Sequence, residues 1–118
     1  MVIRMDNYQP VLNDVFHALA DPTRRAVLRQ LNRGPASITE LAKPFDMALP
    51  SFMKHIAVLE HSDLIRSRKK GRVRTCTLKP RKLARAERWL AEQRVLWEGR
   101  TDRLAQYAES RASKEAKP

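Results

Sequence analysis

The 118-residue chain has a single cysteine and no apolar run long enough to span a membrane. One cysteine excludes an internal disulfide, and the start of the chain lacks the apolar stretch of a secretion signal. We therefore expect a cytoplasmic protein with one modest core and no membrane association. The sequence also has no glycine-rich phosphate loop, no nucleophile-and-base arrangement and no metal-ligand constellation, so we expect neither an enzyme nor a cofactor.

Acidic residues are scarce where basic residues gather. The chain has 24 Lys and Arg against 13 Asp and Glu, which gives a formal charge of +11. Residues 66–85 contain ten basic residues and no acid, while the charges elsewhere nearly cancel. Such a balance favours a polyanionic partner, most often nucleic acid. Because Val73, Cys76 and Leu78 interrupt this segment, it does not read as a disordered basic tail.

The first half of the chain predicts three helices. Residues 11–19 carry a helical apolar stripe. Asp21 suits the N-cap of a second helix, with Pro22 at its first position. A third, short helix begins at Ser37 and Glu40, which match the capping box S-x-x-E: the hydroxyl accepts from the Glu40 N–H and the carboxylate reaches back.

A longer helix follows after a tight connection, with Pro50 in its first turn. Phe52, Ile56 and Leu59 fall at i, i+4 and i+7, so one side of this helix is apolar and should be buried. A short helix, a turn and a longer helix form the arrangement of a helix-turn-helix.

After Asp63 the periodicity changes to that of strands. Leu64–Lys70 and Arg72–Leu78 predict two strands of a hairpin around Gly71. Cys76 should be buried near the base of the hairpin, and the arginines near its tip should lie in solvent.

The last predicted helix, about residues 80–108, is long for so small a domain. Leu83, Leu90, Trp97 and Leu104 are spaced by seven, which predicts a seam against a partner helix. The alternative is that the helix packs only on its own domain. The predicted seam comprises Leu83, Ala86, Trp89, Leu90, Leu96, Trp97, Leu104 and Tyr107.

These elements predict a mainly α fold with a small β-hairpin, that is, a winged helix-turn-helix with a long C-terminal dimerisation helix. We divide the chain into an N-terminal tail (1–8), a winged helix-turn-helix domain that includes the dimer helix (9–108), and a flexible tail (109–118).

The stretches LADPTRRAVLRQL, SITELA, ALPSFMKHIAVLEHSDLI and KKGRVRTCTL together resemble the ArsR family of bacterial repressors over about residues 12–79. The resemblance implies homodimers that block transcription by occupying an operator, with the longer helix in the major groove. Three positions depart from the family pattern: Ala48 replaces a cap serine, Met53 replaces another serine, and Asp63 replaces a turn glycine.

Many relatives sense metals, through cysteines near the helix before the turn or through His and carboxylate ligands on the last helix. Here ELAKPFDM has no cysteine and the last helix has no histidine. His17, His55 and His61 lack the number and spacing of a ligand set, so we expect no metal site. Cys76 could be a redox sensor, but we expect it to be a buried core thiol whose pKa is lowered by the basic residues around it.

Ser51 is short enough to allow close approach to base edges, while Lys54 and His55 can donate to phosphates or guanine acceptors. His55 could instead hydrogen-bond within the protein. The basic hairpin should lie beside or in the adjacent minor groove. The predicted DNA-binding residues are Thr39, Pro50, Ser51, Lys54, His55, Lys69, Lys70, Arg72 and Arg74.

These observations predict a homodimeric, sequence-specific repressor of its own or neighbouring genes, bound to an imperfect palindrome in double-stranded DNA. The alternatives are a non-specific architectural DNA-binding protein, a metal- or redox-responsive repressor, and a protein-interaction module built on the long helix.

Overall fold

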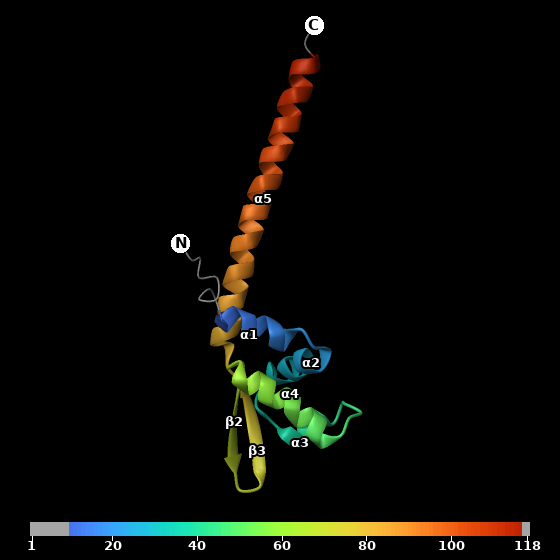
Figure 1. Cartoon of the computed structure of the whole chain (residues 1–118), viewed down its shortest axis with the longest axis vertical. Coiled ribbons are helices and arrows are strands. Elements are labelled where there is room, and N and C mark those ends of the chain that lie inside the picture. Colours follow the sequence, from blue (N-terminus) through green and yellow to red (C-terminus); the bar gives the residue numbers. More distant parts are fainter. Residues whose placement is uncertain (1–9, 117–118) are drawn as a thin grey trace, which may run out of the picture. The chain divides into compact units, whose positions relative to one another are not determined.

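The computed structural model describes residues 10–116, so the predicted tail at residues 1–8 lies outside the described part (Figure 1). Two compact units divide the chain after Ala86, and the last helix runs through that division. The elements are α1 (Pro10–Leu19), α2 (Pro22–Leu31), β1 (Ala36–Ser37), α3 (Ile38–Ala42), α4 (Leu49–His61), β2 (Ile65–Lys70), β3 (Val73–Leu78) and α5 (Pro80–Ala116).

The predicted caps start the second and third helices. The Asp21 carboxylate accepts from the Arg24 backbone N–H at 3.0 Å, and Pro22 occupies the first turn of α2. At α3 the Ser37 hydroxyl accepts from the Glu40 N–H at 3.1 Å and donates to the Glu40 carboxylate at 3.0 Å. The bonds to Asp21 and Ser37 satisfy the Arg24 and Glu40 amides, which a helix leaves without backbone partners at its N-terminus.

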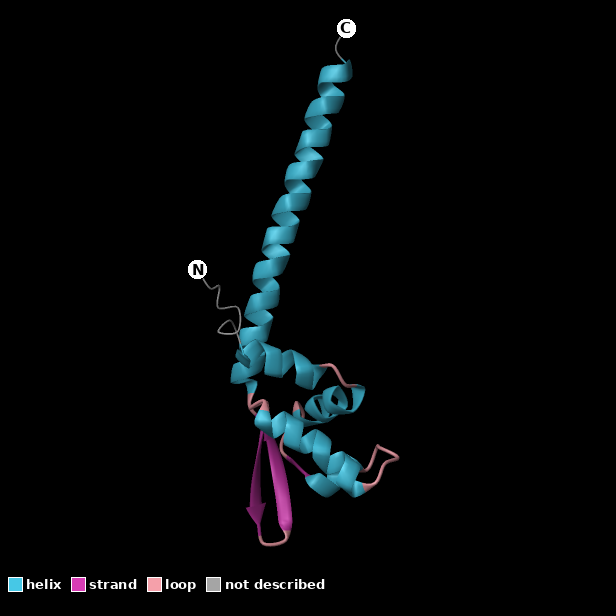
Figure 2. Cartoon of the chain, viewed as in Figure 1, coloured by secondary structure: helices cyan, strands magenta, loops and turns pink. Residues whose placement is uncertain are grey.

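The sheet has three antiparallel strands in the order β1-β3-β2, one more than the sequence predicts (Figure 2). Cys76 pairs with Ala36 of β1 on one side of β3 and with Ser67 of β2 on the other. Gly71 makes the turn between β2 and β3 with a φ of 64°, a conformation that glycine adopts without steric cost. We call residues 65–78 the wing.

Among the described residues, every buried hydrophobic side chain belongs to the first unit. Helices α1, α2, α3 and α4 each bury one side, and the sheet adds residues from its base. The most buried large side chains are Phe52, Leu41, Ile56, Leu59, Leu64, Val15, Val27 and Cys76. The apolar side predicted for residues 52–59 is therefore confirmed, and it anchors α4 in the body of the fold.

Asp63 connects α4 to β2 with a φ of 60°, in the left-handed region that aspartate tolerates better than most residues. Its carboxylate accepts from the Lys79 ammonium, and the Lys79 backbone N–H donates to Leu64 at 2.8 Å. The hydrogen bond from Lys79 is the largest cause of the lowered pKa of Asp63, and the charges of Lys79, Lys82 and Arg81 add to it against the opposing effect of burial. These contacts tie the base of the wing to the residue before α5.

The last helix is longer than predicted. The sequence predicts an end near Ala108, whereas α5 continues to Ala116. Residues 109–116 contain neither glycine nor proline, so no helix breaker interrupts them. The segment predicted as a flexible tail is thus helical as far as it is described. None of the described helices combines the length and the apolarity needed to cross a membrane.

Candidate nucleic-acid interface

The second helix of the helix-turn-helix, α4, has one buried side and one exposed side. Phe52, Ile56 and Leu59 are buried, while Ser51 and Lys54 are exposed. Pro50, in the first turn of the same helix, is also exposed. The N-terminal half of α4 therefore offers a hydroxyl and an ammonium group to a partner while its other side holds the helix in place.

The start of α4 has no side-chain cap. Ala48 occupies the N-cap position with extended backbone and makes no capping hydrogen bond. The Phe52 amide is the first that bonds within the helix, to the Ala48 carbonyl at 3.1 Å. The preceding amides of this turn therefore lack the side-chain acceptor that Asp21 gives α2 and Ser37 gives α3.

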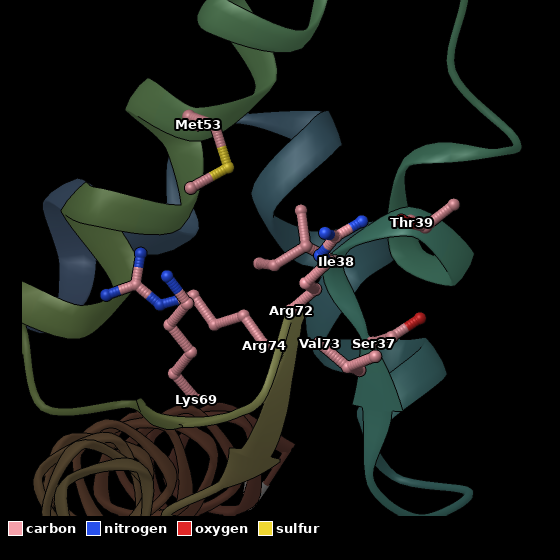
Figure 3. A pocket seen from close by; sticks show the side chains of 8 residues that line it. All are labelled: Ser37, Ile38, Thr39, Met53, Lys69, Arg72, Val73 and Arg74. Carbon is pink, nitrogen blue, oxygen red and sulfur yellow. The ribbon is translucent and has the colours of Figure 1, made fainter.

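An open groove of about 680 Å³ lies between the wing and the helix-turn-helix (Figure 3). We call it the wing groove. Three of its residues are cationic and come from the wing, and Met53 comes from α4. The remainder come from β1, from the start of α3 and from β3. Its lining is Ser37, Ile38, Thr39, Met53, Lys69, Arg72, Val73 and Arg74. The wing groove thus brings cations and hydroxyl groups together on one side of the first unit.

The wing separates its basic residues onto two faces. Lys69, Arg72 and Arg74 line the wing groove, and Lys69 pairs directly with Arg74 across the two strands. Lys70 instead lines a second hollow together with Arg66 and Arg68. The sequence prediction placed Lys70 with the first group and omitted these two arginines. Strand alternation would have found them, because positions 66, 68 and 70 share one face of β2.

His55 lies in a network with two residues of the segment that begins α2. Its Nδ1 lies 3.1 Å from the Arg24 Nη1 and 3.6 Å from the Asp21 Oδ2. Burial raises the pKa of Asp21, but the backbone N–H groups of Arg24 and Thr23 and the positive charge of Arg24 act in the opposite direction, and the net pKa is lowered. The alternative predicted for His55, a hydrogen bond within the protein, therefore holds for its Nδ1 atom.

Cys76 is fully buried in the central strand, as predicted. Burial is the largest cause that raises its pKa, and the Glu60 carboxylate adds to it, while Arg74 acts in the opposite direction. The expectation that basic neighbours would lower this pKa was wrong, because removal from water outweighs one nearby cation. A raised pKa leaves less thiolate, the reactive form.

We expect the Cys76 thiol to react with a disulfide reagent at pH 8 at least about a hundredfold more slowly in the native chain than in denaturant, because both its raised pKa and its burial suppress attack. Absorbance of the released thiolate follows the reaction. Rapid stoichiometric labelling of the native chain would contradict this and would support the redox-responsive alternative.

Most of the predicted seam is exposed in the single chain. Trp97 is 67% exposed and Leu104 is 61% exposed, although each has a large apolar side chain. Leu90, Leu96 and Tyr107 are exposed to similar extents. Leu83 and Trp89 are half-buried, and Ala86 is buried at 3%. Because Ala86 packs within its own chain, we leave it out of the surface offered to a partner.

The described residues contain no group of three or more His, Cys, Asp and Glu side chains that could hold a metal ion.

Known proteins similar to this chain bear on its family. A model for a helix-turn-helix domain matches residues 19–68. The transcriptional repressor SdpR of Bacillus subtilis is 35% identical over 60 residues, which cover 51% of this chain and 67% of that protein. The crystal structure of an ArsR family transcriptional regulator is 64% identical with a TM-score of 0.74, covering 77% of this chain and 94% of that one.

A third relative shares the fold at low identity. The homodimeric winged helix-turn-helix DNA-binding domain of Mb0332 from Mycobacterium bovis is 18% identical, with a TM-score of 0.59 over 87% of this chain and 93% of that domain. SdpR and the ArsR family regulator of known structure, together with the winged helix-turn-helix architecture, identify this chain as a member of the ArsR family of DNA-binding transcriptional regulators.

Proposed function

We propose that this chain acts in the cytoplasm as a homodimeric repressor that occupies an imperfect palindromic operator near its own or neighbouring genes. In this proposal α4 enters the major groove with Ser51 and Lys54 toward base edges. The wing contacts the adjacent backbone and minor groove, and Thr39 contacts phosphate at the start of α3.

The observation that carries this proposal is the wing groove. Lys69, Arg72 and Arg74 of the wing share it with Thr39 of α3 and Met53 of α4. Duplex DNA presents its phosphates beside the groove edges, so a protein that reads it needs cations next to its recognition helix. The first unit supplies them there, and the formal charge of +11 favours the same partner.

Dimerisation is the second part of the proposal. The second unit exposes Leu90, Leu96, Trp97, Leu104 and Tyr107 along one helix. Several large apolar side chains exposed on one helix are unusual for a soluble monomer and indicate an interaction site. A second copy of the chain is the partner we propose, in line with the homodimeric domain of Mb0332. Two recognition helices would then read half-sites about 34 Å apart.

Binding should weaken steeply with salt. Each neutralised phosphate contributes about −0.9 to the log–log slope of the binding constant against salt. With about six to eight phosphate contacts per dimer, the affinity should fall by several decades between low and high salt.

Lys54→Ala and Arg72→Ala should weaken DNA binding in different ways. We expect Lys54→Ala to cost about tenfold on the cognate duplex and less on an unrelated one, because a base contact is lost. Arg72→Ala should weaken both duplexes and make the salt slope shallower by about one, because a phosphate contact is lost. Fluorescence anisotropy at several salt concentrations measures both. Equal losses for both variants on both duplexes would exclude Lys54 from base readout.

Selection of bound fragments from genomic DNA tests the proposal as a whole. A shared, nearly palindromic motif upstream of a few genes supports an operator-binding repressor. Uniform recovery of unrelated fragments would favour the architectural alternative, and no recovery at low salt would favour the protein-interaction module.

A further inference from the structure

Arg24 connects three helices through one guanidinium group. Its Nε donates to the Ala18 carbonyl at 2.8 Å and its Nη2 to the His17 carbonyl at 3.0 Å, both at the end of α1. Its Nη1 lies 3.1 Å from Nδ1 of His55, which is 31 residues away on α4. A residue of α2 thus fixes the end of α1 and touches the helix proposed to enter the major groove.

The chemistry of this contact determines the tautomer of His55. A guanidinium has only donors, so the Arg24 Nη1 must donate and the His55 Nδ1 must accept. A neutral imidazole that accepts at Nδ1 carries its proton on Nε2. Asp21 and Arg24 present opposite charges to this ring, but the Asp21 oxygen is 3.6 Å from Nδ1, beyond hydrogen-bond length, and already accepts from the Arg24 amide at 3.0 Å. Arg24 is therefore the direct partner.

We propose that Arg24 is a positioning residue for DNA recognition, which holds His55 as the Nε2–H tautomer so that this N–H donates to an acceptor atom of the duplex. The inference rests on the proposed function. The His55 side chain is 23% exposed, so part of its ring reaches the surface of the single chain. Ser51 precedes His55 by four residues, so both lie on the same side of α4.

The neighbouring arginine provides a matched control. Arg25 donates from its Nη1 to the Leu19 carbonyl at 2.7 Å, which is also at the end of α1. Arg24→Ala and Arg25→Ala each remove one positive charge and at least one bond to that helix end. Only Arg24 contacts His55, so a difference between the two variants reports on the histidine.

The tautomer can be observed directly in the full-length chain. With ¹⁵N-labelled histidine, long-range ¹H–¹⁵N correlation spectra at neutral pH should show His55 with a bare Nδ1 and a protonated Nε2, assigned by comparison with His55→Gln. Arg24→Ala should yield a tautomer mixture, whereas Arg25→Ala should keep the wild-type pattern. A protonated Nδ1 in the wild-type chain would overturn the proposal, and this measurement requires no substitution at Arg24.

Binding supplies the functional test, with a duplex recovered by selection from random-sequence DNA and an unrelated duplex of equal length. We expect Arg24→Ala to weaken binding about fivefold and Arg25→Ala less than twofold, since one hydrogen-bond donor to the DNA is lost only in the former. In a His55→Ala background, which has neither an acceptor for Arg24 nor a donor for the duplex, the effect of Arg24→Ala should disappear because its route of action is gone. Circular dichroism establishes that each variant is folded.

The two duplexes identify the acceptor. A loss confined to the selected duplex assigns a base-edge acceptor, and an equal loss on both assigns a phosphate oxygen. Either result supports the proposal. An undiminished effect of Arg24→Ala in the His55→Ala background would overturn it while leaving the proposed function intact. Failure of the wild-type chain to bind any duplex would overturn both, although the spectra would still report the tautomer.

Discussion

Phe52→Ala is expected to remove about 3–5 kcal/mol from the free energy of unfolding, the usual cost of truncating a core phenylalanine. Phe52 is completely buried, and its ring centroid lies 5.6 Å from that of Phe45, in the connection before α4. Truncation leaves a cavity and ends this aromatic contact. Because small domains are stable by only about 5–15 kcal/mol, this loss is a large fraction of the total free energy of unfolding.

Urea denaturation followed by circular dichroism measures this loss. Lys54→Ala is the matched control, since Lys54 is exposed on the same helix and surface substitutions usually change stability by less than about 0.5 kcal/mol. A loss below about 1 kcal/mol for Phe52→Ala would show that α4 is not anchored through this side chain.

Trp97→Ala should weaken the proposed dimer by about a thousandfold. Trp97 is 67% exposed in the single chain and lies in the middle of the seven-residue apolar spacing. Removal of an anchoring tryptophan from an interface costs about 2 kcal/mol or more. The change occurs in both copies, so the total is about 4 kcal/mol. Sedimentation velocity over a range of protein concentrations measures the shift in the dissociation constant.

Val95→Ala is the control for this experiment. Val95 is also an exposed apolar residue of α5, at 63%, but it lies two positions before Trp97, about 200° around the helix. Its truncation should leave the dimer unchanged if the seam runs through Trp97. Unaltered association of the Trp97 variant, with loss of association in the Val95 variant, would place the interface on the opposite side of the helix.

Local signals in the sequence were sufficient for most of the first unit. The cap at Asp21, the cap at Ser37 and the spacing of the buried residues of α4 all depend on residues within one or two turns, and the structure confirms each. The Glu40 carboxylate accepts from the Ser37 hydroxyl, not from the backbone N–H of the usual capping box. Strand β1 was missed because two residues are too few to show an alternating pattern. It forms only because β3 offers an edge for it to pair with, which is a tertiary effect.

The exposed residues of the candidate site could be predicted from local patterns in the same way. Exposed Ser51 and Lys54 follow from the periodicity of one helix, and exposed Arg72 and Arg74 follow from their place near a hairpin tip. The contact between Arg24 and His55 joins residues 31 apart, and no local pattern indicates it. The raised pKa of Cys76 was likewise missed, because it depends on burial by neighbouring elements rather than on the adjacent basic residues.

The alanine at position 48 has a thermodynamic consequence for a complex of the proposed kind. A helix that supplies its own N-terminal acceptor gains that stabilisation, about 1 kcal/mol, on folding. Helix α4 forgoes it, because Ala48 gives its early amides no side-chain acceptor. A phosphate oxygen at that position would satisfy the same amides and meet the positive end of the helix dipole. The capping free energy that most helices gain on folding would then be gained by α4 only when it binds DNA, at the end of the helix nearest the bases.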